Sequence, residues 1–436
     1  MKRNSALLSF IADLVALAYE RIFNEKATAE AKDFLKTLSY VVPVMAFAGL
    51  ASLAFDVLAG KVLGPGGYGE FALAQSVAMF LYLPMLLGFN TAMVKYNVEA
   101  DDVERQSKII SATYILVAMF TLVSVGLLYF FSAQLSNVFS VSQKLFHLAI
   151  VFAILFVLYT LATSTLQSLF KMKTYVIFQM VCAAILLSSF VVFILSGLYS
   201  FEYAVYSMYL AYGATGTVLL VFFLRGYFKF GFDKSWANIL TRYSLLAVGG
   251  GVAFALYINI DKILLNKYMA ISDVGIYRAY YLTSIYVAMS LFTIFNVVFF
   301  PTVSKYENKG PVFKRLNKLM PYLGGVGLPA MVICQFVFLK FYGVRYPFNL
   351  GLSVLFGLAA VIMFINGCYA WLMVSLGERG VRVAVLCAAV CAAVNVALNI
   401  VLIPLVGIAG AVVALIAGYL AYTALLLSQR RLLLAG

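Results

Sequence analysis

Charged side chains are scarce in this sequence: Asp, Glu, Lys and Arg make up 11% of its 436 residues, whereas 64% are hydrophobic. A water-soluble protein has roughly a quarter of its residues charged. The composition therefore excludes a soluble globular protein. If membrane spans of about 20 residues use most of the chain, the short loops that remain leave no room for a soluble catalytic domain.

Histidine and paired cysteines are also lacking. His147 is the single histidine, and the five cysteines lie inside apolar segments with no CxxC spacing. This pattern argues against a zinc site and against disulfides. There is no GxSxG, HExxH or Walker signature, and no GxGxxG motif that follows a strand. The sequence therefore predicts no enzyme, no catalytic residues, no metal site and no bound cofactor.

Long apolar segments are what the chain has in abundance. We predict twelve transmembrane helices, which makes the protein an all-α polytopic membrane protein. The predicted spans are residues 38–60, 70–92, 109–131, 145–168, 174–196, 200–224, 244–267, 277–302, 317–340, 349–374, 381–403 and 407–428.

The basic residues lie mostly on one side of these spans. When the loops are assigned alternately to two sides, 24 of the 31 Lys and Arg fall on the side of the N-terminus and 7 on the other. The positive-inside rule then places both termini in the cytoplasm, with the protein in the cell membrane. The same pattern accounts for the net charge of +14 without a nucleic-acid partner, because the basic residues form no single binding face.

The predicted spans fall into two groups of six. Residues 1–36 predict an amphipathic segment at the cytoplasmic surface, because their apolar stretch is too short to span a membrane. Residues 37–224 and 244–436 are expected to form an N-lobe and a C-lobe. The aromatic and basic linker 225–243 between them is expected to lie on the cytoplasmic leaflet.

The two halves resemble each other in sequence. KVLGPGGYGEF follows the first span and KYMAISDVGIY the seventh, which separates Gly69 from Gly275 by 206 residues. Gly197 and Gly407 are 210 residues apart at corresponding places. A tandem repeat of six spans predicts two parallel six-helix bundles around a central cleft, as in transporters built from parallel repeats.

Charged residues within spans are the first candidates for a site, because their burial in a membrane is costly. Asp56 and Asp261 occupy nearly equivalent repeat positions, and each has a cation nearby in sequence, Lys61 for Asp56 and Lys262 for Asp261. One interpretation is that they line the cleft and bind a phosphate–sugar headgroup or a coupling ion. The other is that they form ion pairs that hold the first and seventh helices in register.

Other polar residues complete the candidate substrate site. Arg278, like Lys61 and Lys262, is one of the few cations outside the cytoplasmic side. Asn90 and Asn259 have amides that suit either sugar hydroxyls or a neighbouring helix. For Asn395 and Asn399 on the eleventh span, contacts between helices are the preferred interpretation.

Four segments carry a resemblance to a known family. They are KVLGPGGYGEFALAQ (61–75), LGFNTAMVKY (87–96), DKILLNKYMAISDVGIYRAYY (261–281) and GERGVRVAVLCAAVCAAVNVALNIVLIPLVGIAGAVVA (377–414). In this order and spacing the chain resembles the polysaccharide-transporter (Wzx-type) flippases. These belong to the multidrug/oligosaccharidyl-lipid/polysaccharide exporter superfamily.

The resemblance implies two six-helix bundles around a central cavity. It also implies alternating access that moves a polyprenyl-(pyro)phosphate-linked oligosaccharide from the cytoplasmic to the outer leaflet. By position, Lys61 and Asp261 match the basic and acidic places of the family, whereas Asp56, Lys262 and Arg278 are additional features of this chain. The implied partners are the lipid-linked glycan, membrane lipids and other glycan-assembly membrane proteins. Coupling to an H+ or Na+ gradient, or to the membrane potential, stays open.

Two other functions compete with this one. A cation-coupled multidrug exporter of the same superfamily would need an acid deep inside a lobe, whereas Asp56 and Asp261 are predicted toward the outer side. A polymerase or ligase of the same pathway would need a large outer loop with catalytic Arg or His. The predicted outer loops are too short for that.

Overall fold

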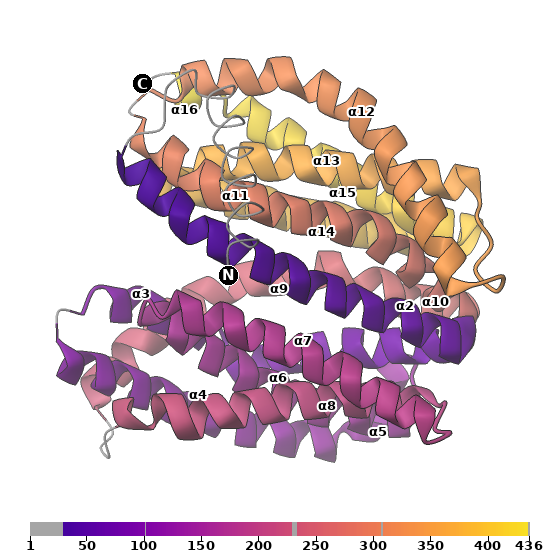
Figure 1. Cartoon of the computed structure of the whole chain (residues 1–436), viewed down its shortest axis with the longest axis horizontal. Coiled ribbons are helices and arrows are strands. Elements are labelled where there is room, and N and C mark those ends of the chain that lie inside the picture. Colours follow the sequence, from indigo (N-terminus) through magenta and orange to yellow (C-terminus); the bar gives the residue numbers. More distant parts are fainter. Residues whose placement is uncertain (1–28, 101, 229–232, 307, 435–436) are drawn as a thin grey trace, which may run out of the picture. The chain divides into compact units, whose positions relative to one another are not determined.

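The computed structural model describes residues 29–100, 102–228, 233–306 and 308–434, and nearly all of them are helical (Figure 1). No strand occurs in these ranges. The predicted all-helical fold is confirmed. Most of the predicted amphipathic segment 1–36 lies outside the described residues, and its last part, from Ala29 onward, belongs to the first helix.

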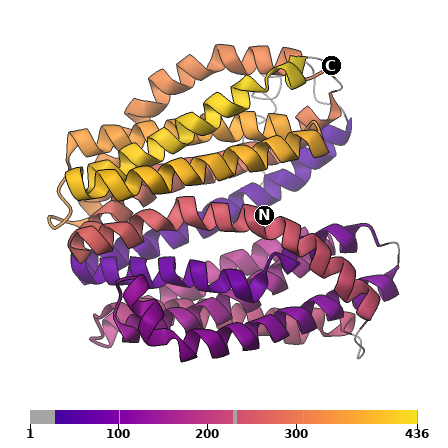
Figure 2. The same ribbon diagram turned by 180° about the vertical axis from the view of Figure 1, so that it is seen from behind.

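The helices follow one another with short connections (Figures 1 and 2). Elements η1 and η3 are π-helical and η2 is a 3-10 turn. The elements are α2 (Ala29–Leu86), α3 (Phe89–Val98), α4 (Val103–Phe130), α5 (Ser132–Val138), α6 (Gln143–Ser168), α7 (Met172–Leu195), α8 (Phe201–Val218), η1 (Leu219–Leu224), η2 (Arg225–Tyr227), α9 (Lys234–Tyr268), α10 (Ile271–Tyr281), η3 (Leu282–Tyr286), α11 (Val287–Lys305), α12 (Gly310–Tyr342), α13 (Leu350–Val374), α14 (Glu378–Val406), α15 (Ile408–Ser428) and α16 (Arg431–Leu434).

Ten helices in the described part of the chain are long and apolar enough to cross a membrane. Two features explain the difference between these ten helices and the predicted twelve. The first two predicted spans both lie in α2, which breaks at Gly64, where φ is 68°. The eighth predicted span is interrupted by the π-helical element η3. The count of twelve stays a prediction, whereas the multi-pass helical architecture is established.

One compact unit consists of residues 51–278 and 399–408. Within it α6 packs against α8, and α7 also contacts α8 (Figure 1). Aromatic side chains fill part of the space between α6 and α8, where the ring of Tyr212 lies 5.6 Å from Phe152 and 5.4 Å from Phe156. All seven residues of the predicted substrate site belong to this unit.

The other compact unit consists of residues 1–50, 279–398 and 409–436. In its described part α13 packs against α11 and α12, and Leu433 of α16 joins the same apolar core. The Lys309 ammonium caps the C-terminal end of α11, because it donates to the Val303 carbonyl at 2.5 Å and to the Tyr306 carbonyl. Burial lowers the pKa of Lys309. The predicted lobes 37–224 and 244–436 have different boundaries from these units and stay predictions.

The predicted linker 225–243 is partly helical. Asp233 caps α9 by accepting hydrogen bonds from the backbone N–H groups of Ser235 and Trp236. The rings of Trp236 and Tyr243 lie 6.0 Å and 5.7 Å from the ring of Tyr96 on α3. These two aromatic side chains therefore contact α3, which offers their apolar rings a partner, and the placement of the linker on the leaflet stays a prediction.

Candidate functional site

A buried ion pair connects α2 and α10. The Arg278 Nη2 donates to Asp56 Oδ1 at 2.6 Å, and the Arg278 Nε donates to the same oxygen at 3.2 Å. The third donor, Arg278 Nη1, reaches Gln75 Oε1 at 2.5 Å, and the Tyr68 hydroxyl donates to Asp56 Oδ1 at 3.1 Å. Both charges thus have several partners, which is the condition under which a buried ion pair is tolerated.

Aromatic rings surround the guanidinium of Arg278. Its central carbon lies 4.8 Å from the ring centroid of Phe71 and 5.2 Å from that of Tyr68. Cations attract the faces of such rings, and the attraction grows when water is excluded. Because Arg278 is 5% exposed and Asp56 9% exposed, water is largely excluded here.

Two glycines allow α2 and α10 to approach this closely. A Cβ added to Gly69 would lie 2.1 Å from the Ile271 carbonyl oxygen, and one added to Gly275 would lie 2.0 Å from the Pro65 carbonyl oxygen. Only glycine fits in such a backbone-to-backbone contact. Since Arg278 follows Gly275 by three residues on α10, the contact also holds Arg278 close to α2.

The contact is symmetrical in the predicted repeat. Pro65 and Ile271 are 206 residues apart, as are Gly69 and Gly275, so each half supplies the same two positions. A second repeat pair also has matching backbone conformation, because Gly197 and Gly407 have φ values of 80° and 60°. The structure therefore gives equivalent local roles to glycines that the sequence comparison paired.

Asp261 lies in a second polar cluster of the same unit. It is fully buried, and its two carboxylate oxygens accept hydrogen bonds from the Tyr277 hydroxyl at 2.6 Å and the Asn399 amide at 2.5 Å. The neighbouring Lys262 is also buried, and its Nζ donates to the Ile258 carbonyl of α9 at 2.7 Å. The charge of Lys262 and that of Asp261 attract each other.

The other three predicted residues do not join these clusters. Lys61 is exposed and forms no ion pair with any residue that the structure describes, so the partner of Asp56 is Arg278 and not Lys61. The Asn259 amide donates to the Ala255 carbonyl within α9. Asn90 is half-buried at the start of α3. The structure thus assembles Asp56, Arg278, Asp261 and Lys262, but not the remaining three.

The chemistry of the two clusters differs. Arg278 offers a planar donor set that suits phosphate or carboxylate oxygens. Asp261 is a carboxylate held by hydrogen bonds from two uncharged groups. Among the described residues there is no group of three His, Cys, Asp or Glu side chains with the arrangement of metal ligands. The predicted lack of a metal or cofactor stays a prediction.

A family model described as polysaccharide biosynthesis protein matches residues 34–307, which is more than half of the chain. The chain belongs to this family. The family predicted from the sequence motifs is thereby confirmed. No curated protein matches the chain.

Solved structures share the fold of this chain. The lipid II flippase MurJ in an inward closed conformation has a TM-score of 0.67 at 14% identity, with 90% of this chain and 87% of MurJ covered. An inward-facing multidrug resistance MATE family transporter of the MOP superfamily has a TM-score of 0.62 at 12% identity, with 91% and 94% covered. A mutant of the Vibrio cholerae MATE transporter VcmN has a TM-score of 0.58 at 15% identity, with 92% and 98% covered. At these identities the likeness establishes the fold.

Proposed function

We propose that this protein is a flippase that moves a polyprenyl-(pyro)phosphate-linked oligosaccharide from the cytoplasmic to the outer leaflet by alternating access. The family and the fold support a membrane transporter or flippase. A phosphorylated sugar chain cannot cross hydrocarbon unaided, because its hydroxyls and charges would lose their water. A protein path with polar groups removes that cost while the lipid tail stays in the bilayer, and no bond has to be broken.

The buried Asp56–Arg278 pair is the observation that supports the choice of a phosphorylated substrate. Arg278 is a guanidinium whose fork of donors matches phosphate oxygens as well as carboxylate oxygens. In this proposal a substrate phosphate replaces Asp56 as the partner of Arg278 at one stage of transport. Gln75 keeps a hydrogen bond to Arg278 during the exchange, since it binds a different guanidinium nitrogen.

The proposal is tested by following a fluorescent polyprenyl-diphosphate-linked glycan across the membrane of proteoliposomes. We expect movement well above that of empty vesicles, and we expect Lys61→Ala to slow it without loss of folded protein. Lys340→Ala is the matched control, because Lys340 is also exposed and predicted on the outer side. Glycan movement no faster than in empty vesicles, together with efflux of a cationic drug, would favour the multidrug exporter instead.

The Asp261 cluster favours coupling to a cation gradient. Two of the groups that hydrogen-bond this buried carboxylate, Tyr277 and Asn399, are uncharged, and a carboxylate with such partners inside a membrane helix is a suitable site for H+ or Na+. We propose that Asp261 carries the coupling ion. This feature would also serve the multidrug exporter, which is why the substrate assay and not the coupling assay decides between them.

Asp261→Asn is expected to remove the response of transport to an imposed H+ or Na+ gradient. The amide keeps the size of the side chain but cannot take up a charge-compensating cation. The measurement is the initial flipping rate with and without each gradient, with the exposed Glu99→Gln as control. A gradient response equal to that of the unmodified protein would leave Asp261 with a structural role only.

A further inference from the structure

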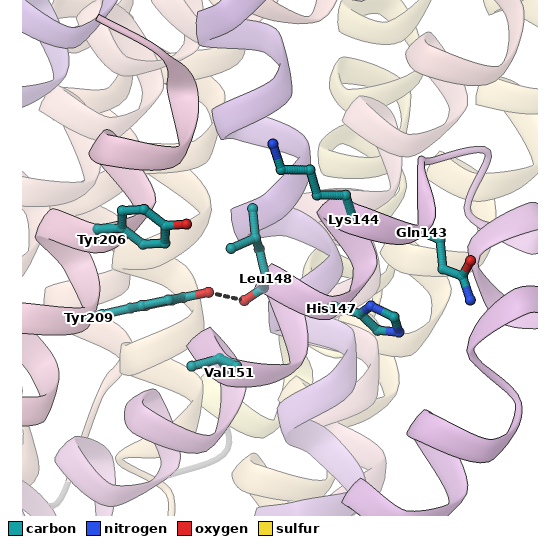
Figure 3. Close-up of a pocket in the computed structure, with 7 residues that line it drawn as sticks. All are labelled: Gln143, Lys144, His147, Leu148, Val151, Tyr206 and Tyr209. Atoms are coloured by element: carbon teal, nitrogen blue, oxygen red, sulfur yellow. Dashed lines mark hydrogen bonds between the residues drawn. The ribbon is translucent and has the colours of Figure 1, made fainter. Parts of the chain in front are cut away.

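An open pocket of about 620 Å³ lies at the beginning of α6 and α8 (Figure 3). Tyr206 and Tyr209 extend from α8 toward α6, and the Tyr209 hydroxyl donates to the Leu148 carbonyl at 2.5 Å. Lys144 and Val151 of α6 line the same pocket. None of these residues belongs to the Asp56 or Asp261 clusters, so the pocket is separate from the proposed transport site.

The pocket changes from polar to apolar along the helices. Lys144 lies in the first turn of α6, whereas Leu148 and Val151 lie one and two turns further along. At about 1.5 Å per residue, Lys144 and Val151 are separated by about 10 Å along the helix axis. The polar zone of a leaflet is roughly 5–8 Å thick. Because α6 is long and apolar enough to span a membrane, its first turn is expected at a membrane surface. A ligand that fills this pocket then has a polar group at that surface and an apolar part directly below it, which is the shape of a lipid.

The polar end of the pocket carries charges of both signs. Lys144 Nζ lies 2.5 Å from Glu202 Oε1, and the Lys144 side chain is 69% exposed whereas that of Glu202 is 14% exposed. Glu70 is close enough for its charge to interact with both residues. The Lys144 ammonium has three N–H donors, and its bond to Glu202 uses one of them. Two carboxylates beside one ammonium disfavour a ligand that is purely anionic.

We infer that this pocket binds the headgroup of a zwitterionic aminophospholipid such as phosphatidylethanolamine. Its phosphate accepts hydrogen bonds from the exposed Lys144 ammonium, and its own ammonium lies in the field of Glu202 and Glu70. The acyl chains follow Leu148 and Val151 into the hydrocarbon, and the ring of Tyr206 covers the glycerol region, as expected of an aromatic residue at a membrane interface. This inference is independent of the substrate of transport.

The test is native mass spectrometry of the purified full-length protein after washing in detergent with defined lipids. Phosphatidylethanolamine should be retained at least about fivefold more than phosphatidylglycerol, which corresponds to about 1 kcal/mol and is typical of one exposed charge pair. It should also be retained several times more than phosphatidylcholine, whose trimethylated ammonium cannot donate hydrogen bonds to a carboxylate. Equal retention of the three lipids would refute the inference.

Two substitutions separate this site from general lipid binding. Lys144→Gln should reduce the retention of all three phospholipids, because the positive charge that attracts the phosphate is lost. Glu202→Gln should shift the preference toward phosphatidylglycerol, since the ammonium of Lys144 then loses its paired charge. A merely structural role of Glu202 would not change the order of lipids. Lys340 is an exposed lysine at the end of α12, and Lys340→Gln should change neither the retention of the lipids nor their order of preference. Unchanged lipid order in Glu202→Gln, in protein that remains folded and monodisperse, would contradict the inference.

Discussion

Arg278→Met is expected to destabilise the protein by about 3–5 kcal/mol, because it leaves the Asp56 carboxylate buried without its counter-charge. The double variant Asp56→Leu with Arg278→Met should recover most of that loss, since neither charge is then buried alone. The recovery of stability should not be complete. In the double variant the Tyr68 hydroxyl loses its acceptor Asp56, and the Gln75 amide oxygen loses its donor Arg278.

The measurement is the free energy of unfolding in a bilayer mimetic for both single variants and the double variant. The cycle gives the coupling energy between the two side chains directly. Lys61→Met is the control, because Lys61 is an exposed cation of the same unit without an ion pair to a described residue, and its stability should stay close to that of the unmodified protein. If the free energy of unfolding falls in the double variant by the sum of its decreases in the two single variants, the two side chains are not coupled.

The same double variant separates folding from transport. A protein that is folded but lacks the guanidinium should flip the lipid-linked glycan at least tenfold more slowly, if Arg278 contacts the substrate phosphate as we propose. The tenfold value corresponds to the loss of about 1.4 kcal/mol, which lies at the lower end for a hydrogen bond to a charged group. Folded double variant with normal transport would restrict Arg278 to a structural role.

The sequence predicted the helices and the buried charges, but not the partners of those charges. Long apolar segments have a direct compositional signal, and a charge inside one is conspicuous. The partner of Asp56, in contrast, is 222 residues away on α10, whereas the nearest cation along the chain is Lys61. We predicted Lys61 as the partner because it is near Asp56 in sequence, whereas the fold brings Arg278 to Asp56.

The neutral members of the site had no distinguishing signal. Tyr68 and Tyr277 are two of 29 tyrosines, most of which an aromatic belt at the membrane surface would explain equally well. Asn399 was expected to contact another helix, and it does so by donating to Asp261 on α9. What could have pointed to Tyr68 is its place in the segment GPGGYGEF, directly before Gly69, which the repeat had already singled out.

Gly69→Ala is the second change for which we expect a large effect. The added Cβ would lie 2.1 Å from the Ile271 carbonyl oxygen. Because both sides of this steric clash are backbone, it can be removed only if α2 and α10 move apart. Overpacking of a tight contact costs about 1–3 kcal/mol by itself. Separation of the two helices would also weaken the hydrogen bonds between Arg278 and Asp56, so the total loss should be at least about 3 kcal/mol.

The repeat supplies an independent form of the same experiment. Gly275→Ala should lower the free energy of unfolding about as much as Gly69→Ala, because its Cβ would lie 2.0 Å from the Pro65 carbonyl oxygen across the same contact. Gly66→Ala is the matched control three residues from Gly69, since nothing lies within 4 Å of a Cβ at that position. The unfolding free energies of the three variants decide the matter. If Gly69→Ala and Gly275→Ala are as stable as Gly66→Ala, α2 and α10 do not meet through their backbones, and the symmetrical contact that holds Arg278 beside Asp56 is wrong.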